Sequence, residues 1–171
     1  MIETFSQFLN KSRVFKLILG AGNNDCEEIR NIVSVYAKAG CRFFDVSANV
    51  EAVQAVKEGI LSVVSKNELN KYFICVSVGT KSDIHIKKCI IDTEKCIGCA
   101  ACTSQCQNGA ISLCGAKSKI DENRCIGCLK CQKICRNNAI NAYSNDKNLE
   151  KLLPELFEVR SEEHTSELQS R

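Results

Sequence analysis

Long apolar runs and histidine are the most informative shortages in this sequence. No stretch approaches the roughly 18 uninterrupted apolar residues that a membrane helix needs. Lys16 interrupts the best early candidate, residues 14–21. A secretory signal peptide also fits poorly, because residues 1–10 contain Glu3 and no early basic region. We therefore expect a cytoplasmic protein without a transmembrane segment, in a compartment that keeps thiols reduced.

The tail of the chain accounts for one of its two histidines, His164. Residues 160–171 read RSEEHTSELQSR and agree at every position with the translation of a common sequencing-adapter read. We expect this tail to be an artefact and not native sequence. On that expectation the natural protein continues past Val159, and residues 144–159 begin a region that is cut short. The other histidine, His85, then has no histidine partner for a catalytic pair.

Apolar and amphipathic segments alternate over residues 1–86, which predicts an α/β domain. Buried strands are expected at residues 15–22, 41–48 and 72–79, with helices at about 25–40 and 50–65. Asp25 and Asn49 are the expected N-caps. The residues expected to face inward are Ile29, Ile32, Val33 and Tyr36 in the first helix, and Val53, Val56, Ile60 and Val63 in the second.

This βαβαβ order predicts right-handed crossovers and a parallel sheet. The domain would be part of a β/α barrel or an open sheet, since three strands cannot close an eight-stranded barrel. Asp45 near the end of the second strand lies where barrel enzymes carry active-site groups. We favour the simpler interpretation that Asp45 orders a loop or caps an element.

A duplicated cysteine pattern follows. Residues 91–111 align with residues 120–140 at a constant shift of 29, and eleven of the 21 aligned positions are identical. Each copy contains C-x2-C-x2-C-x3-C, with Cys96, Cys99, Cys102 and Cys106 in the first run and Cys125, Cys128, Cys131 and Cys135 in the second. Four cysteines at this spacing, twice, predict two [4Fe-4S] clusters. Zinc is disfavoured, because its sites use two well-separated pairs of ligands.

The repeat resembles the bacterial two-cluster ferredoxins over residues 87–143, which implies an α+β ferredoxin-like module. In that family the last cysteine of each run ligates the other cluster. The resemblance implies one cluster on Cys96, Cys99, Cys102 and Cys135, and the other on Cys125, Cys128, Cys131 and Cys106. The family usually has proline after the fourth cysteine, where this chain has Gln107 and Arg136. Gly98 and Gly127 are expected to let the backbone approach the clusters.

Five cysteines lie outside the two runs. Cys26, Cys41 and Cys75 fall in the α/β segment and are expected to be small buried hydrophobic residues. Cys89 and Cys114 flank the first run as extra thiols. A basic stretch before the module contains Lys81, His85, Lys87 and Lys88. It could dock an acidic electron donor, but we favour a solvated linker.

A wider resemblance covers residues 14–159. The segments FKLILGAG and IRNIVSVYAKAGCRFFDVSANVEAVQAVKEGI, a third strand and then the cysteine repeat resemble the cyanobacterial light-dependent-period (LdpA-type) iron–sulfur proteins. This resemblance implies a redox-responsive component of circadian input with a further C-terminal domain. It also implies partners such as a redox protein, the quinone pool, or a clock or signalling protein.

Two functions remain open. The favoured one is a non-catalytic electron carrier or redox sensor, because no nucleophile, acid–base pair or phosphate loop is visible. The alternative is the electron-transfer segment of a barrel oxidoreductase, whose flavin phosphate site would lie in later loops. A nucleic-acid partner is not expected, since thiolate-bound clusters would offset the formal charge of +3.

Overall fold

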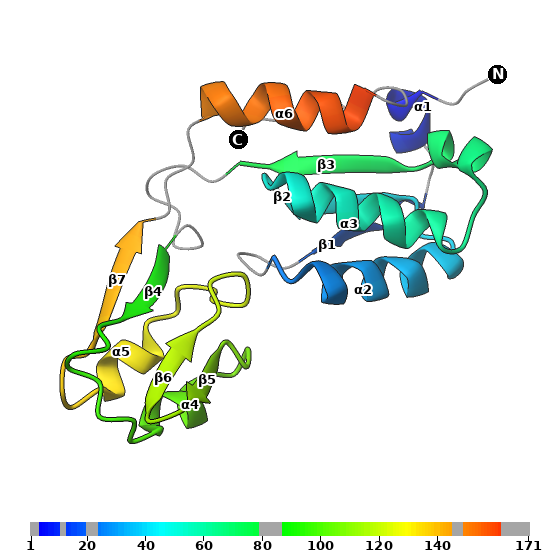
Figure 1. Cartoon of the computed structure of the whole chain (residues 1–171). Helices are drawn as coiled ribbons and strands as arrows, with labels where there is room; N and C mark the ends of the chain where they lie inside the picture. The colour runs from blue at the N-terminus through cyan, green and yellow to red at the C-terminus, as the bar shows by residue number, and fades with distance from the viewer. Residues whose placement is uncertain (1–3, 11–12, 20–23, 79–86, 145–148, 162–171) are drawn as a thin grey trace. The chain divides into compact units, whose positions relative to one another are not determined.

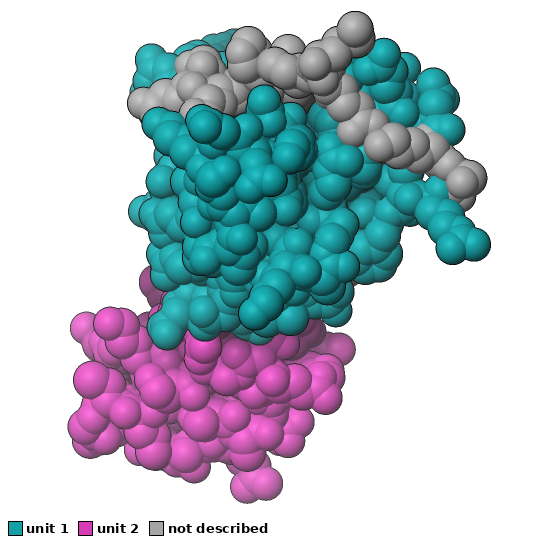
Figure 2. Space-filling view, turned by 90° about the vertical axis from the view of Figure 1, so that its right-hand side faces the viewer, with its two compact units in different colours: residues 1–78, 147–171 teal, residues 79–146 magenta. Residues whose placement is uncertain are grey.

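The computed structural model describes residues 4–10, 13–19, 24–78, 87–144 and 149–161 (Figure 1). The chain divides into two compact units (Figure 2). The first contains residues 1–78 and 147–171, and the second contains residues 79–146. Every helix in the described ranges is too short or too polar to cross a membrane.

The first unit is built on a three-stranded parallel sheet with the order β1-β2-β3. Its elements are α1 (Phe5–Leu9), β1 (Lys16–Ile18), α2 (Cys26–Lys38), β2 (Phe43–Ser47), α3 (Val50–Leu61), the 3-10 helix η1 (Lys66–Lys71), β3 (Phe73–Ser77) and α6 (Leu149–Ser161). The predicted βαβαβ order and parallel pairing are therefore confirmed. The barrel stays a prediction.

Alternating side chains of β2 pack on the two faces of this sheet. Phe44 and Val46 lie in a core with buried residues of α2 and α3, such as Val33 and Ile60. Phe43, on the other face, packs with Phe8 of α1 in a second core. The predicted caps are also present, since Asp25 accepts hydrogen bonds from two N–H groups at the start of α2, and Asn49 accepts one at the start of α3.

Two inward-facing predictions were wrong. Val63 is 37% exposed, because α3 ends at Leu61 and residue 63 has left the helix. Ser62 Oγ donates a hydrogen bond to the carbonyl of Gly59 at that end. Tyr36 is 39% exposed and stacks on Phe15 with ring centroids 6.1 Å apart.

The second unit contains two antiparallel sheets of two strands each. Its elements are β4 (Lys87–Ile91), α4 (Ala101–Gln105), β5 (Ile111–Cys114), β6 (Lys117–Ile120), α5 (Lys130–Ile134) and β7 (Ile140–Ser144). β4 pairs with β7 and β5 pairs with β6. The strands nearest each end of the repeat thus pair with each other, and the inner two form a hairpin.

The duplication in the sequence is also a duplication in structure. Ile91 pairs with Ile140 in one sheet, and Ile111 pairs with Ile120 in the other. A shift of 29 residues converts Ile91 to Ile120 and Ile111 to Ile140. The two halves of the module are therefore related by an approximate two-fold exchange.

Candidate metal centre

The predicted ligand cysteines occupy matching environments in the two copies. The first and third cysteines of each run are buried, the second is exposed and the fourth is half-buried. Cys102, Cys125 and Cys131 belong to the core of the second unit, against which Cys106 and Cys135 pack. Cys96, Cys99 and Cys128 lie outside that core. The interior of this unit is thus lined largely by thiols.

Backbone N–H groups point at the sulfur atoms of the fourth cysteines. Ala110 donates to Cys106 Sγ and Ala139 donates to Cys135 Sγ, each over 3.3 Å. A thiolate is stabilised by such donors, and the thiolate is the form of cysteine that binds metal. This donor set suits a negatively charged ligand at both positions.

Hydrogen-bond donors also surround the first cysteine of each run, and Cys131 in the second run. N–H groups of Ser118 and Gly98 lower the pKa of the Cys96 thiol. The Cys89 thiol and the N–H groups of Gly127 and Cys89 lower the pKa of the Cys125 thiol. A hydrogen bond from the same Cys89 thiol lowers the pKa of Cys131. These hydrogen-bond donors therefore favour the thiolate form of the three cysteines, which iron ligation requires.

Two lysines brace the cysteine loops across the repeat. Lys88 Nζ donates to the backbone carbonyl of Cys125, and Lys117 Nζ donates to the carbonyl of Cys96. Lys88 belongs to β4 and Lys117 to β6, so each loop rests on the strand that begins the other copy. Both also bring a positive charge to a loop that would hold thiolates.

Lys88 corrects part of an earlier expectation. The favoured interpretation of the basic stretch as a solvated linker is wrong for Lys88, which is only 4% exposed. Its burial lowers the pKa of its ammonium group. Lys87 is exposed, whereas Lys81 and His85 lie outside the described residues. The signal for Lys88 was Lys117, which matches it at the same shift of 29.

The glycines of the cysteine loops allow a close approach between the two copies. Gly98 and Gly127 have φ values of +69° and +68°. A Cβ on Gly98 would collide with the carbonyl oxygen of Ala116, and one on Gly127 with that of Lys87. The glycines therefore allow each loop to approach the backbone at the start of the other copy's strand, β6 for Gly98 and β4 for Gly127. Their expected approach to the clusters stays a prediction.

The extra cysteines separate into three kinds. Cys41 and Cys75 are buried in the first unit, which confirms the expectation for them, and Cys26 is half-buried. Cys114 is exposed at the end of β5. Cys89 is 1% exposed and lies in the core with Cys125 and Cys131. The sequence did not predict that Cys89 packs against these two ligand cysteines. The shift of 29 matches Cys89 to Ser118, and this equivalence was the available signal.

Among the described residues, no three His, Cys, Asp or Glu side chains gather closely enough to hold one metal ion. Four sulfur ligands of a single zinc ion lie about 4 Å apart, because each is roughly 2.3 Å from the metal in a tetrahedron. A [4Fe-4S] cube instead takes one thiolate at each of four iron atoms, so its ligands are spread more widely.

The sequence profile described as the 4Fe-4S binding domain matches this chain at residues 89–112 and again at 118–141. The protein carries a ferredoxin-type iron–sulfur module. Each matched segment contains all four cysteines of one run. The ferredoxin-type module therefore binds 4Fe-4S clusters, whose chemistry is one-electron transfer.

A curated protein also resembles this chain. Light dependent period A of Synechococcus elongatus is 30% identical to it over 82 residues, which is 48% of this chain. The aligned stretch covers 23% of that relative, so the chain spans less than a quarter of its length.

Proposed function

We propose that this chain holds two [4Fe-4S] clusters and passes single electrons to and from a redox partner. Cys96, Cys99, Cys102 and Cys135 would hold the first cluster, and Cys125, Cys128, Cys131 and Cys106 the second. The reciprocal support of the cysteine loops carries this proposal, because each loop rests on the other copy's strand. Because each copy already supports the cysteine loop of the other, the fold also suits a fourth ligand that comes from the other copy.

The chain's own residues have separate tasks in this scheme. A bound cluster supplies reversible one-electron chemistry. The buried first and third cysteines would anchor it, while N–H donors such as Ala110 and Ala139 stabilise the thiolates. Cys99 and Cys128 are exposed, so each proposed site has one ligand at the surface. That placement favours electron exchange with a docked redox protein or with a quinone.

The wider role we propose is redox sensing for a light-response or circadian system in the cytoplasm. The likeness to Light dependent period A supports it, and the partner would be a clock or signalling protein. A second candidate is the electron-transfer segment of a barrel oxidoreductase, which the parallel βαβαβ unit favours. Bound flavin, or dye reduction by a nicotinamide donor, in the natural protein expressed anaerobically from its complete gene would support the second candidate over a pure sensor.

Metal content after anaerobic reconstitution tests the cluster proposal. We expect about eight iron and eight sulfide per chain, following from four of each per cluster. Cys106→Ser should perturb the cluster on Cys125, Cys128 and Cys131 and leave the other intact. Paramagnetic resonance of the reduced protein would then show one unperturbed cluster signal. Cys114→Ser is the matched control, because Cys114 is exposed and outside both runs.

Combining variants identifies which cluster is affected. If the fourth cysteine of each run ligates the other cluster, Cys106→Ser and Cys131→Ser damage the same cluster. The double variant then keeps one cluster. Loss of both clusters in that double variant would show instead that Cys106 belongs with Cys96, Cys99 and Cys102. About four iron or fewer in the unmodified chain would mean that it does not hold two clusters, which would refute the proposal.

A further inference from the structure

The two halves of the module differ at one buried position. The shift of 29 that relates Lys88 to Lys117 also relates Cys89 to Ser118. Both residues are buried, at 1% and 4% exposure. The same place in each half therefore carries a thiol in one copy and a hydroxyl in the other.

Each of these side chains lies against the predicted ligands of the other copy. Ser118 Oγ is 3.6 Å from Cys102 Sγ, where the free thiol donates to the hydroxyl. A metal-bound thiolate can only accept, so the hydroxyl would then be the donor. The N–H and the side chain of Ser118 both stabilise the thiolate of Cys96. Cys89 packs with Cys125 and Cys131 in the same buried core. Its thiol lowers the pKa of both cysteines, and its N–H also acts on Cys125. The backbone donors at this pair of positions correspond in the two halves, whereas the side-chain donor differs.

We propose that Cys89 and Ser118 are positioning residues that give the two clusters different reduction potentials. This inference rests on the proposed cluster function. A hydroxyl is a stronger hydrogen-bond donor than a thiol, and hydrogen bonds to the cluster sulfurs help to set the potential. A donor stabilises the more negative, reduced state. The cluster on Cys96, Cys99 and Cys102 therefore has the higher potential, and an electron rests there preferentially.

Cys89 is not a fifth ligand in this account. Its contacts are equivalent to those of Ser118, which belongs to a copy with the same four-cysteine run. If Cys89 were a ligand, its replacement would lower the iron content. If it is a hydrogen-bond donor, the replacement leaves two clusters and changes only their potentials.

Exchange of the two side chains tests the inference. Four proteins would be reconstituted anaerobically: the full chain, Cys89→Ser, Ser118→Cys and the double exchange. Their iron and sulfide contents would be measured first. A redox titration followed by paramagnetic resonance should resolve two midpoints in the unmodified chain. Cys89→Ser should raise the lower midpoint and narrow the gap. Ser118→Cys should lower the upper midpoint potential, which also narrows the gap between the two midpoints.

Two further variants complete the test. Ser118→Ala should lower the upper midpoint further than Ser118→Cys does, because no side-chain donor remains. Cys114→Ser should move neither midpoint, since Cys114 is exposed on β5. The double exchange should restore two separated midpoints.

The outcomes distinguish the two proposals. Failure of the unmodified chain to bind two clusters refutes the proposed function itself. Two clusters with coincident midpoints, or a gap that Cys89→Ser leaves unchanged, overturn the inference alone. Loss of one cluster in Cys89→Ser also overturns it, because Cys89 would then be needed for binding and not for tuning.

Discussion

Gly98 and Gly127 show how single residues hold the cysteine loops against the strands of the ferredoxin-type module. Their left-handed backbone is strained for residues with a side chain. Ala100 and Leu129 share that backbone, with φ values of 59° and 61°, although they carry side chains. Left-handed φ values thus recur around the second cysteine of both runs, and strain of this kind is typical of functional loops.

Gly98→Ala should destabilise the second unit more than Gly115→Ala does. Both glycines have positive φ, but an added Cβ meets nothing within 4 Å at Gly115 and collides with Ala116 at Gly98. The backbone conformation costs about 1–2 kcal/mol in each variant, and overpacking adds about 1–3 kcal/mol at Gly98 only. Chemical unfolding of the reconstituted chain would measure both. Equal losses would contradict the close approach described above.

At this scale the sequence predicted the residues whose chemistry depends on spacing. The cysteine runs, Asp25 and Asn49 were visible because each follows a local rule of ligation or capping. Lys88 was not predicted, because it neighbours the chemically identical Lys87, and in the sequence only the match of Lys88 to Lys117 distinguishes the two. Cys89 was recognised as an extra thiol, but its contacts depend on residues more than thirty positions away.

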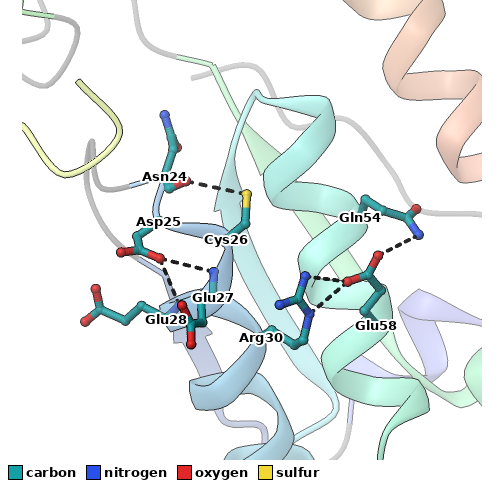
Figure 3. A network of polar contacts seen from close by, with 8 residues as sticks. All are labelled: Asn24, Asp25, Cys26, Glu27, Glu28, Arg30, Gln54 and Glu58. Carbon is teal, nitrogen blue, oxygen red and sulfur yellow. Dashed lines mark hydrogen bonds and ion pairs between the residues drawn. The ribbon is translucent and has the colours of Figure 1, made fainter. Parts of the chain in front are cut away.

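Helices α2 and α3 meet at a close contact that depends on Gly59. A Cβ there would lie 2.7 Å from the carbonyl oxygen of Arg30 and 2.8 Å from Cβ of Val33. Arg30 and Glu58 also join the two helices, with 2.8 Å between Nε and Oε2 (Figure 3). This ion pair is about 40% exposed on both sides, so close packing contributes more to the helix contact than charge does.

Gly59→Ala should destabilise the first unit by up to about 2 kcal/mol. Alanine gains about 1 kcal/mol of helix propensity over glycine, but the backbone and Cβ atoms that it meets cannot move without separating the helices. Gln54→Ala is the control, since Gln54 is exposed on the same helix. Thermal unfolding followed by circular dichroism would compare them. A more stable Gly59→Ala variant would show that the helices are not in close contact at this point.

Strand and helix positions in the first unit were largely predictable, because their apolar periodicity is strong. Polar contacts between strands were not. Asp45 accepts hydrogen bonds from Lys16 at 2.7 Å and from Ser77 at 2.5 Å, so it joins all three strands. These partners come from segments about thirty residues away on either side, which no local pattern reveals. Asp45 thus links neighbouring strands, whereas the interpretation favoured from sequence was a loop-ordering or capping residue.

The two units draw their stability from different sources. The first has helices of 13 and 12 residues packed on a parallel sheet. The second has five-residue helices and sheets of two strands, around a core that contains several cysteines. Helices and sheets this small are marginal alone. Bound clusters would therefore contribute much of the folding energy of the second unit.

Removal of the clusters should unfold the second unit and spare the first. We expect hydrogen exchange after iron chelation to accelerate across residues 87–144, while amides of β2 and β3 keep their protection. A mock-treated, reconstituted sample is the control. Unchanged exchange in residues 87–144 would mean that the thiol-lined core is stable without metal. Equal acceleration in both units would mean that they unfold together.

The reciprocal bracing of the cysteine loops also limits how such a module could have arisen. A chain with one copy alone would have a loop whose lysine, strand and glycine contact are all missing, because the other copy supplies them. Two identical single-copy chains, related by a two-fold axis, could supply them to each other. Within this chain the duplication supplies both halves of that support, so neither copy needs a second molecule to complete its loop.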